Sequence, residues 1–126
     1  YRNFYFYQMV YYISYFEMRK SQCQIIHNLH QEMRKMRTMP KQAKIVAEYM
    51  LYLTDYIDEH NNPEKQKQKL DNICNEIKAD ELPKTREEFE SRAVLYHVLM
   101  DIEEFLKCKQ NFIENLNEVQ IKKYWK

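Results

Sequence analysis

The chain is 126 residues long and contains no glycine. At the average usage of about 7%, a chain of this length would hold roughly nine glycines. Tight hairpins, strand bulges and phosphate-cradling loops depend on glycine, because it enters positive-φ conformations at little cost. The composition is also rich in Glu, Lys, Gln, Leu and Met, which favour helices. We therefore expect an all-α domain.

Proline residues at positions 40, 63 and 83 divide the sequence into four segments. Within the segments, apolar residues recur at steps of three and four, which predicts helices over about 3–37, 41–60, 63–79 and 86–123. Short connections between helices imply antiparallel neighbours. We expect one domain over residues 1–126, an up-down antiparallel four-helix bundle with long first and last helices.

The start of the last helix carries a capping box, Thr85 followed by Glu88. In this motif the hydroxyl accepts a hydrogen bond from the amide three residues on, and Glu88 reaches back to the Thr85 amide. Further along, Phe89, Ala93, Tyr96 and Leu99 are spaced to line one face. We expect that face to be buried.

The charge balance and the cysteines argue against several classes of protein. Twenty basic and nineteen acidic residues leave a net charge of +1, whereas nucleic-acid-binding domains are usually clearly basic. Cys23, Cys74 and Cys108 show neither disulfide-framework nor metal-site spacing, which is typical of reduced thiols in a cytosolic protein. No run of apolar residues is long enough to span a bilayer, so this piece is expected to be soluble. We expect no nucleic-acid partner and no cofactor.

Two groups on helix faces could carry chemistry. Cys23, His27 and His30 share one face and could hold a metal, but a structural zinc site needs four ligands and no further pair stands nearby. Asp101 could orient the His97 imidazole for base catalysis, but no nucleophile motif accompanies the two residues, and a surface ion pair explains them better. We expect no enzymatic activity.

A basic corner surrounds Pro40, with no acidic residue between its cations. It could face an anionic partner, but charge runs usually mark a solvated surface, and cations also suit the end of a helix. Its members are Arg34, Lys35, Arg37, Lys41 and Lys44.

The first sixteen residues, Tyr1 to Phe16, hold nine of the eighteen aromatic side chains. Aromatic residues at consecutive positions point all round a helix, so one neighbour cannot bury them all. Three interpretations stay open: core packing with some exposed tyrosines, a surface for homo-oligomer formation, or a position next to a membrane.

The stretch 82–106 reads LPKTREEFESRAVLYHVLMDIEEFL. It resembles the C-terminal domain of the putative aromatic acid exporter family of bacterial membrane proteins, in which an LPKTREEFE-like run precedes an LEEFL-like one. Ile102 replaces the usual leucine of that second run. The aromatic first segment and the corner with Gln42-Ala43-Lys44 also match the family layout.

The resemblance implies that the chain, which begins at Tyr1, is a fragment that follows a transmembrane region and lies on the cytoplasmic side of the membrane. It implies a part in exporting aromatic carboxylates, with an assembly, gating or substrate-sensing role, but it supplies no ligand residues. From the side chains alone, Arg92 between Phe89 and Tyr96 could bind an aromatic carboxylate by stacking and a fork-like ion pair. An ion pair with Glu88 is the structural alternative for Arg92. For the whole chain, the alternatives are a self-standing dimerisation module or a small-molecule-binding bundle.

Overall fold

The computed structural model describes the backbone of residues 2–124 and the side chains of residues 5–122. This part of the chain contains helices and no strand, which confirms the all-α class. Its elements in chain order are α1 (Arg2–Met33), α2 (Gln42–Leu53), the 3₁₀ turn η1 (Thr54–Tyr56), α3 (Glu64–Lys78), α4 (Arg86–Glu114) and α5 (Glu118–Tyr124).

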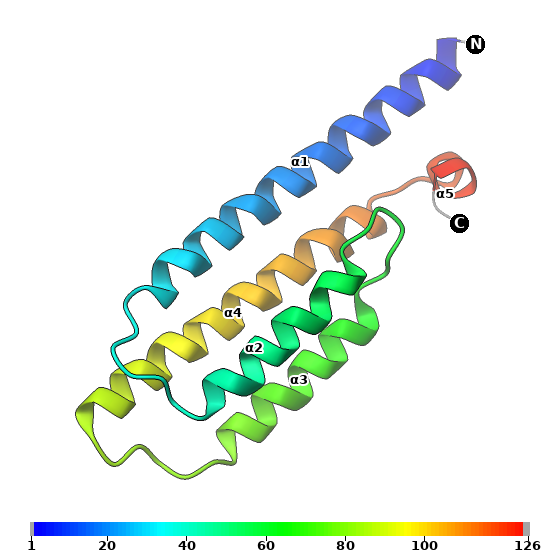
Figure 1. The fold of residues 1–126 in the computed structure, drawn as a ribbon. Coiled ribbons are helices and arrows are strands. Elements are labelled where there is room, and N and C mark those ends of the chain that lie inside the picture. Colours follow the sequence, from blue (N-terminus) through cyan, green and yellow to red (C-terminus); the bar gives the residue numbers. More distant parts are fainter. Residues whose placement is uncertain (1, 125–126) are drawn as a thin grey trace.

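The four longer helices lie roughly side by side, and the chain direction alternates from each to the next (Figure 1). Helix α4 is the central one, because it packs against α1, α2 and α3. In the described chain, the backbone of α1 approaches only α4 and α5 closely. The N-terminal turns of α1 extend past the end of α4 (Figure 1). One long side of α1 is therefore left without a neighbour.

Most of the buried apolar side chains form one cluster, which we call the large core. They come from all four longer helices, and Val98 and Leu70 are each only 1% exposed. The Tyr49 hydroxyl donates a hydrogen bond to the Gln66 carbonyl inside this core, and burial raises the pKa of Tyr49. The large core comprises Leu29, Ala43, Val46, Tyr49, Leu53, Leu70, Ile73, Ile77, Leu95, Val98, Leu99, Ile102, Phe105 and Leu106.

A second, smaller cluster lies between the N-terminal half of α1 and the end of α4. We call it the aromatic cluster: its buried members are Tyr11, Met18 and Phe112, and Tyr15 packs against them. The Phe112 ring centroid lies 5.6 Å from that of Tyr11 and 5.8 Å from that of Tyr15, at angles typical of favourable ring pairs. Part of the aromatic opening segment is therefore core. Tyr1 lies outside the described residues.

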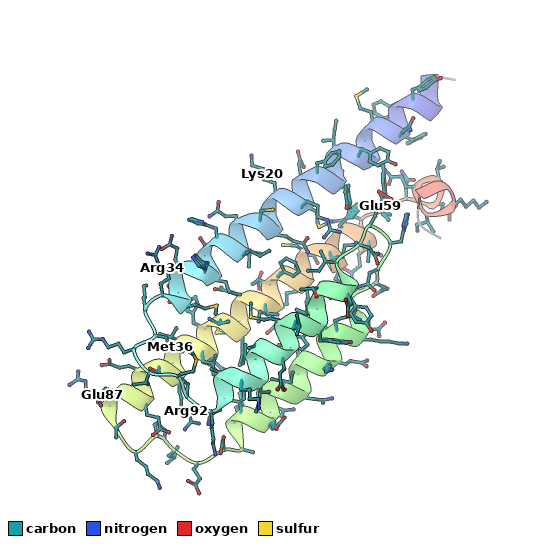
Figure 2. The ribbon with its side chains drawn as sticks, in the orientation of Figure 1. Lys20, Arg34, Met36, Glu59, Glu87 and Arg92 are labelled. Atoms are coloured by element: carbon teal, nitrogen blue, oxygen red, sulfur yellow. The ribbon has the colours of Figure 1, made fainter. Side chains whose placement is uncertain are left out.

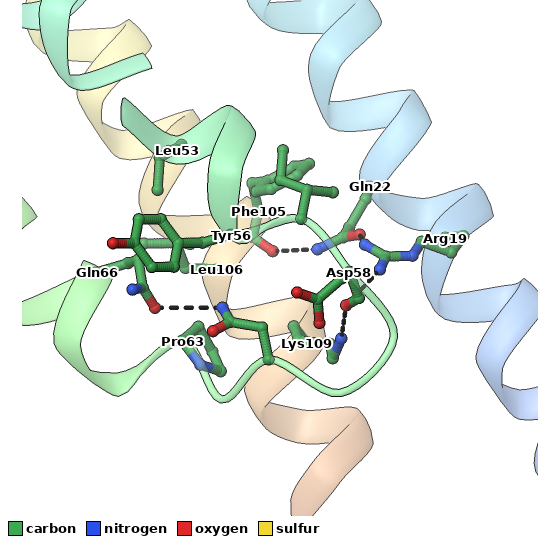
Figure 3. Close-up of a pocket in the computed structure, with 12 residues that line it drawn as sticks. Arg19, Gln22, Leu53, Tyr56, Asp58, Pro63, Gln66, Phe105, Leu106 and Lys109 are labelled. Atoms are coloured by element: carbon green, nitrogen blue, oxygen red, sulfur yellow. Dashed lines mark hydrogen bonds between the residues drawn. The ribbon is translucent and has the colours of Figure 1, made fainter. Parts of the chain in front are cut away.

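A polar layer, buried at Gln22 and Lys109, lies between the two clusters along α1 and α4, and Figure 3 shows its side chains. Gln22 of α1 donates a hydrogen bond to the Phe105 carbonyl of α4 (2.9 Å), and both Arg19 and Lys109 donate to the Asp58 carbonyl. Burial, followed by the nearby Arg19 charge, lowers the pKa of Lys109 to about 8. These bonds attach the connection between η1 and α3 to both α1 and α4.

Two predicted helices end earlier than the sequence suggested. Helix α1 stops at Met33 instead of residue 37, and the amide and hydroxyl of Thr38 both bond to Ser91 Oγ, at 3.3 and 2.8 Å. Helix α2 stops at Leu53 and tightens into η1, so Ile57 is exposed and lies outside the core. Both connections are held by contacts to distant elements, which periodicity along the chain does not reveal.

The start of α4 confirms the predicted cap at Thr85 but corrects its second half. Thr85 Oγ1 accepts a hydrogen bond from the Glu88 amide (3.1 Å), as expected. The Glu88 carboxylate, however, accepts from the Lys84 amide (3.2 Å) and not from that of Thr85. Thr85 is in an extended conformation, and the carboxylate bonds to the amide of the residue before it.

The predicted buried face of α4 is wrong for three of its four residues. Phe89, Ala93 and Tyr96 are exposed, and only Leu99 is buried. The helix is rotated so that Ser91, which is bonded to Thr38, faces inward. The observed buried stripe is Ser91, Leu95, Val98, Leu99, Ile102, Phe105, Leu106, Lys109 and Phe112.

The last predicted helix, 86–123, is divided in two. Helix α4 ends at Glu114, and α5 starts at Glu118. Asn117 Oδ1 accepts from the Gln120 amide (2.9 Å), and Gln120 Oε1 accepts from the Asn117 amide (3.0 Å). This reciprocal pair is a capping box, and it starts a new helix in place of a continuation of the old one.

Candidate functional site

The three residues singled out as ligand-binding candidates, Phe89, Arg92 and Tyr96, line the same groove on the outer side of α4. The groove has a volume of about 230 Å³ and lies where the ends of α2, α3 and α4 meet. Its walls are mainly apolar. The remaining lining residues are Gln42, Ile77, Lys78, Pro83, Ala93 and Leu95.

Helical spacing explains why three residues of α4 meet here. Positions 89, 92, 93 and 96 follow one another at steps of three, one and three, so they share a face of the helix. That face is turned away from the large core, because α4 buries Leu95, Val98 and Leu99 instead. The two aromatic rings are consequently 61% (Phe89) and 44% (Tyr96) exposed.

Arg92 is held in place by two contacts on one nitrogen. Its Nη1 donates a hydrogen bond to the Glu81 carbonyl and lies 3.9 Å from the Glu88 carboxylate. The side chain is 16% exposed, and Figure 2 shows it at the end of the molecule where α2 begins. The ion pair between Arg92 and Glu88, the structural alternative for this residue, is therefore present. Among the described residues, no hydrogen bond or ion pair engages the other guanidinium nitrogens.

A second cation borders the groove. The ammonium of Lys78 lies 5.8 Å from the Tyr96 ring centroid, within cation–π range. Gln42, which is 2% exposed, has its amide nitrogen 2.7 Å from Asp80 Oδ2, so it is committed to that carboxylate. The Glu81 amide, and then the side chains of Lys41 and Gln42, lower the pKa of Asp80. Asp80 thus carries a negative charge that is bonded to Gln42 and paired with Lys41.

The sequence did not point to Lys78 or Gln42 as part of this site, because they belong to other helices. The available signal was indirect: Lys78 ends one predicted helix just before Pro83, and Gln42 begins another just after Pro40. Antiparallel helices bring such ends together. The resulting set of two cations and two aromatic rings suits a planar anion, with an aromatic body against the rings and a carboxylate near the guanidinium.

The other histidine and cysteine candidates lie elsewhere. Cys23, His27 and His30 are all exposed on α1, far along the chain from the groove residues. His97 Nδ1 lies 3.4 Å from Asp101 Oδ2 on α4, as a surface pair one helical turn apart. Within the described side chains, no three His, Cys, Asp or Glu residues gather as a metal ion would require.

The basic corner is mostly exposed, and two of its cations are paired. Lys35 lies 3.0 Å from Glu32, and Lys41 lies 3.2 Å from Asp80. Arg34 is exposed near the end of α1 (Figure 2). The corner therefore contains ordinary surface ion pairs, whose contribution to stability is small.

A different cavity, beside Arg19 and Lys109, is too small for a substrate. It has a volume of about 20 Å³, room for about one water molecule. It belongs to the buried polar layer shown in Figure 3. None of the described helices has the length and hydropathy needed to cross a bilayer.

The described residues thus form a helical domain with an open groove lined by Phe89, Arg92 and Tyr96. Residues 1–110 match the family described as the putative aromatic acid exporter C-terminal domain. The chain belongs to this family, as the stretch 82–106 predicted. It is 36% identical over 98 residues to the protein named "Uncharacterized protein YqjA" of Bacillus subtilis (strain 168).

The match to the Bacillus protein takes up 78% of this chain but only 30% of that relative's length. The relative is thus much longer than the domain described here. No solved structure gives a significant match to the chain.

Proposed function

We propose that the chain is a non-catalytic, cytoplasmic-side domain of an aromatic acid exporter and that it senses the exported acid through the groove of Phe89, Arg92 and Tyr96. In this proposal the longer helices act as an up-down four-helix bundle, and a membrane-spanning region of the same protein precedes it. Occupation of the groove would be passed to that region as a gating signal.

The observation that carries the proposal is the family match over residues 1–110. It supports membership of an exporter in which this domain is the C-terminal part. The match covers only 30% of the Bacillus relative's length, which supports the presence of a larger region outside this domain.

The groove supports a binding role in preference to a catalytic one. Neither a carboxylate nor an imidazole is among its lining residues, so a general base paired with a nucleophile is missing from the lining. Arg92 is pre-positioned by the Glu81 carbonyl and keeps donors for an incoming carboxylate. Phe89 and Tyr96 offer ring faces beside it. An aromatic carboxylate can bind to both the guanidinium and the ring faces, whereas a neutral aromatic amide can use only the ring faces.

The first test is the natural reading frame. The proposal requires several hydrophobic spans encoded upstream of Tyr1. A complete gene without such spans would contradict it.

The second test is calorimetric titration of the chain with benzoate, with benzamide as the neutral comparison. We expect benzoate to bind and benzamide to bind at least tenfold more weakly. Arg92→Lys keeps the charge but loses the planar fork, so benzoate affinity should fall about tenfold, or about 1.4 kcal/mol. Arg86→Lys, on the exposed first turn of the same helix, is the matched control. Equal binding of benzoate and benzamide would refute the sensing site.

A self-standing dimerisation module is the second candidate, and a specific observation favours it. The N-terminal half of α1 exposes large apolar side chains, including Phe6, Met9 and Phe16. Dimerisation is compatible with membership of an exporter.

A further inference from the structure

An apolar hollow lies between α1 and α2, over α4, and it shares no lining residue with the groove around Arg92. Its volume is about 190 Å³, and its walls include Ile25 and Ile26 of α1, Met50 of α2 and Ile102 of α4. The backbones of α1 and α2 do not approach each other closely in the described chain, which leaves this space open. In another protein, a cavity of about 150 Å³ with similar walls binds benzene. The hollow therefore has room for the apolar body of a small ligand.

The walls of the hollow offer very little to a polar ligand. Thr54 carries the one hydroxyl among the lining residues, and this hydroxyl donates a hydrogen bond to the Leu51 carbonyl (2.6 Å). Two of the walls, Ile26 and Ile57, are 49% and 45% exposed. Water in such a space has few polar partners, so an apolar group that replaces it gains from the burial.

Two cations lie beside the hollow. The water-sized cavity next to Arg19 and Lys109 shares three of its walls with the hollow, namely Leu53, Ile57 and Phe105. This cavity is too small for a whole ligand, but its volume of about 20 Å³ is enough for one carboxylate oxygen. The apolar hollow and the polar layer are therefore neighbouring parts of one region, and Figure 3 shows its polar side.

The acceptors that hold the Arg19 guanidinium are all neutral. Nε donates to the Tyr15 hydroxyl (3.1 Å), and Nη1 donates to Gln22 Oε1 (2.7 Å). Nη2 donates to the Asp58 carbonyl (2.8 Å), which also accepts a hydrogen bond from the Lys109 ammonium. Hydrogen bonds from a guanidinium or an ammonium to a carboxylate are about twice as strong as those between neutral groups. A carboxylate is consequently a better shared acceptor for these two cations than the carbonyl is.

We propose that this region binds an amphipathic monocarboxylate. The carboxylate replaces the Asp58 carbonyl as the acceptor of Arg19 and Lys109, and the apolar chain fills the hollow between α1 and α2. The distance fits a chain of medium length, because Arg19 and Ile26 are seven residues apart, or about 10 Å along the helix. An extended octanoate ion has a similar length. The proposal does not depend on the groove around Arg92.

The first experiment is calorimetric titration of the chain with octanoate, with octanamide as the neutral comparison. We expect octanamide to bind at least tenfold more weakly, because it keeps the alkyl chain and loses the charge. Arg19→Gln should lower octanoate affinity at least tenfold. Lys20→Gln is the matched control, since it removes the same charge from the next, exposed position of α1. Equal affinity for the two ligands, or an equal loss in the two variants, would overturn the proposal.

The second experiment fills the hollow and leaves the polar layer unchanged, so it remains informative if Arg19→Gln does not fold. Ile26→Trp places a larger side chain in the wall of the hollow and should lower octanoate affinity at least tenfold. Ile13→Trp is its control, because Ile13 is similarly exposed (51%) on the same helix and does not line the hollow. Circular dichroism should show an unchanged fold for both variants. Unchanged octanoate affinity in folded Ile26→Trp would refute the site.

Two further outcomes would assign the ligand or the hollow differently. Octanoate affinity that falls in Arg92→Lys but not in Arg19→Gln would place the ligand in the groove and overturn this second site. Absence of octanoate binding, together with a monomer–dimer equilibrium that Ile26→Trp shifts, would give the hollow to a second copy of the chain and also overturn the proposal.

Discussion

The two apolar clusters of this domain differ in size and in what surrounds them. The large core draws on side chains from all four longer helices. The buried members of the aromatic cluster come from α1 and α4, and the reverse side of α1 at this level is exposed. The large core therefore supplies most of the apolar burial that stabilises the fold, whereas the aromatic end leaves one side of α1 exposed.

The buried polar layer lies between these two regions and ties them together. It consists of Arg19, Gln22 and Lys109 with the Asp58 carbonyl. A polar layer interrupts the apolar contact between α1 and α4. Its directional hydrogen bonds, however, set the register of the two helices. The following substitutions test the contrast between the clusters.

The largest effect is expected in the large core. Leu99→Ala should lower the free energy of unfolding by about 4 kcal/mol, because it leaves a cavity among residues from several helices. Met18→Ala in the aromatic cluster should cost only about 2 kcal/mol, since fewer elements surround it. Urea denaturation followed by circular dichroism measures both. If Met18→Ala lowers the free energy of unfolding as much as Leu99→Ala does, the two clusters do not differ in their contribution to stability.

The next effect concerns the polar layer and depends on pH. The pKa of Lys109 is about 8 in the folded chain, against about 10.4 for an unfolded lysine. Between these values the unfolded state binds more protons, so the Lys109 contribution makes the folded state more stable as pH rises, by on the order of 2 kcal/mol. Lys109→Met should remove this rise.

The measurement is the difference in unfolding free energy between the original chain and the variant, from pH 7.5 to 10. A C74S/C108S background avoids the two thiols, because burial raises the pKa of each. Lys107→Met is the matched control: Glu103 raises the pKa of Lys107, so no rise in stability arises from it in this window. A flat difference for Lys109→Met would show that the layer is more hydrated than the structure indicates.

Loss of a helix cap should have a smaller effect that differs between the two ends. Thr85→Ala removes the hydrogen bond to the Glu88 amide at the start of α4 and should cost about 1 kcal/mol. Asn117→Ala at the start of α5 should cost about 0.5 kcal/mol, because α5 adds little to either cluster. Thermal unfolding of the two variants side by side gives the comparison. A larger loss for Asn117→Ala would mean that α5 supports the aromatic cluster more than its contacts suggest.

The smallest effect on folding is expected on the outer face of α1. Ile13→Glu should change the unfolding free energy of the monomer by less than about 0.5 kcal/mol, because the side chain is already half exposed. Denaturation at low protein concentration, where the monomer prevails, measures this. A loss of several kcal/mol would show that Ile13 belongs to the fold and not to a free surface.

Local signals in the sequence predicted the class of the fold and the start of α4. The cap depends on residues within one turn, so Thr85 and Glu88 were sufficient to locate it. The Asn117–Gln120 box that starts α5 is equally local, but the apolar pattern over 86–123 runs across it and predicts a single helix. The ends of α1 and α2 were not predictable, because bonds to Ser91 and to Lys109 hold the following connections.

The rotation of α4 shows the limit of periodicity. Two apolar stripes run along its first half, one through Phe89 and Tyr96 and the other through Leu95 and Val98. Both satisfy helical spacing, so only the contacts with other helices decide which is buried. The same outcome explains the candidate site: Phe89, Arg92 and Tyr96 share a groove because their face is the outer one.

No described residue has a positive φ angle. Every connection is therefore made from extended and right-handed conformations, which any residue can adopt. The unfolded chain, lacking glycine, also has access to fewer backbone conformations than an average chain. Less conformational entropy is lost on folding as a result. A domain with one modest core and one side of α1 left open can consequently stay folded before any partner covers that side.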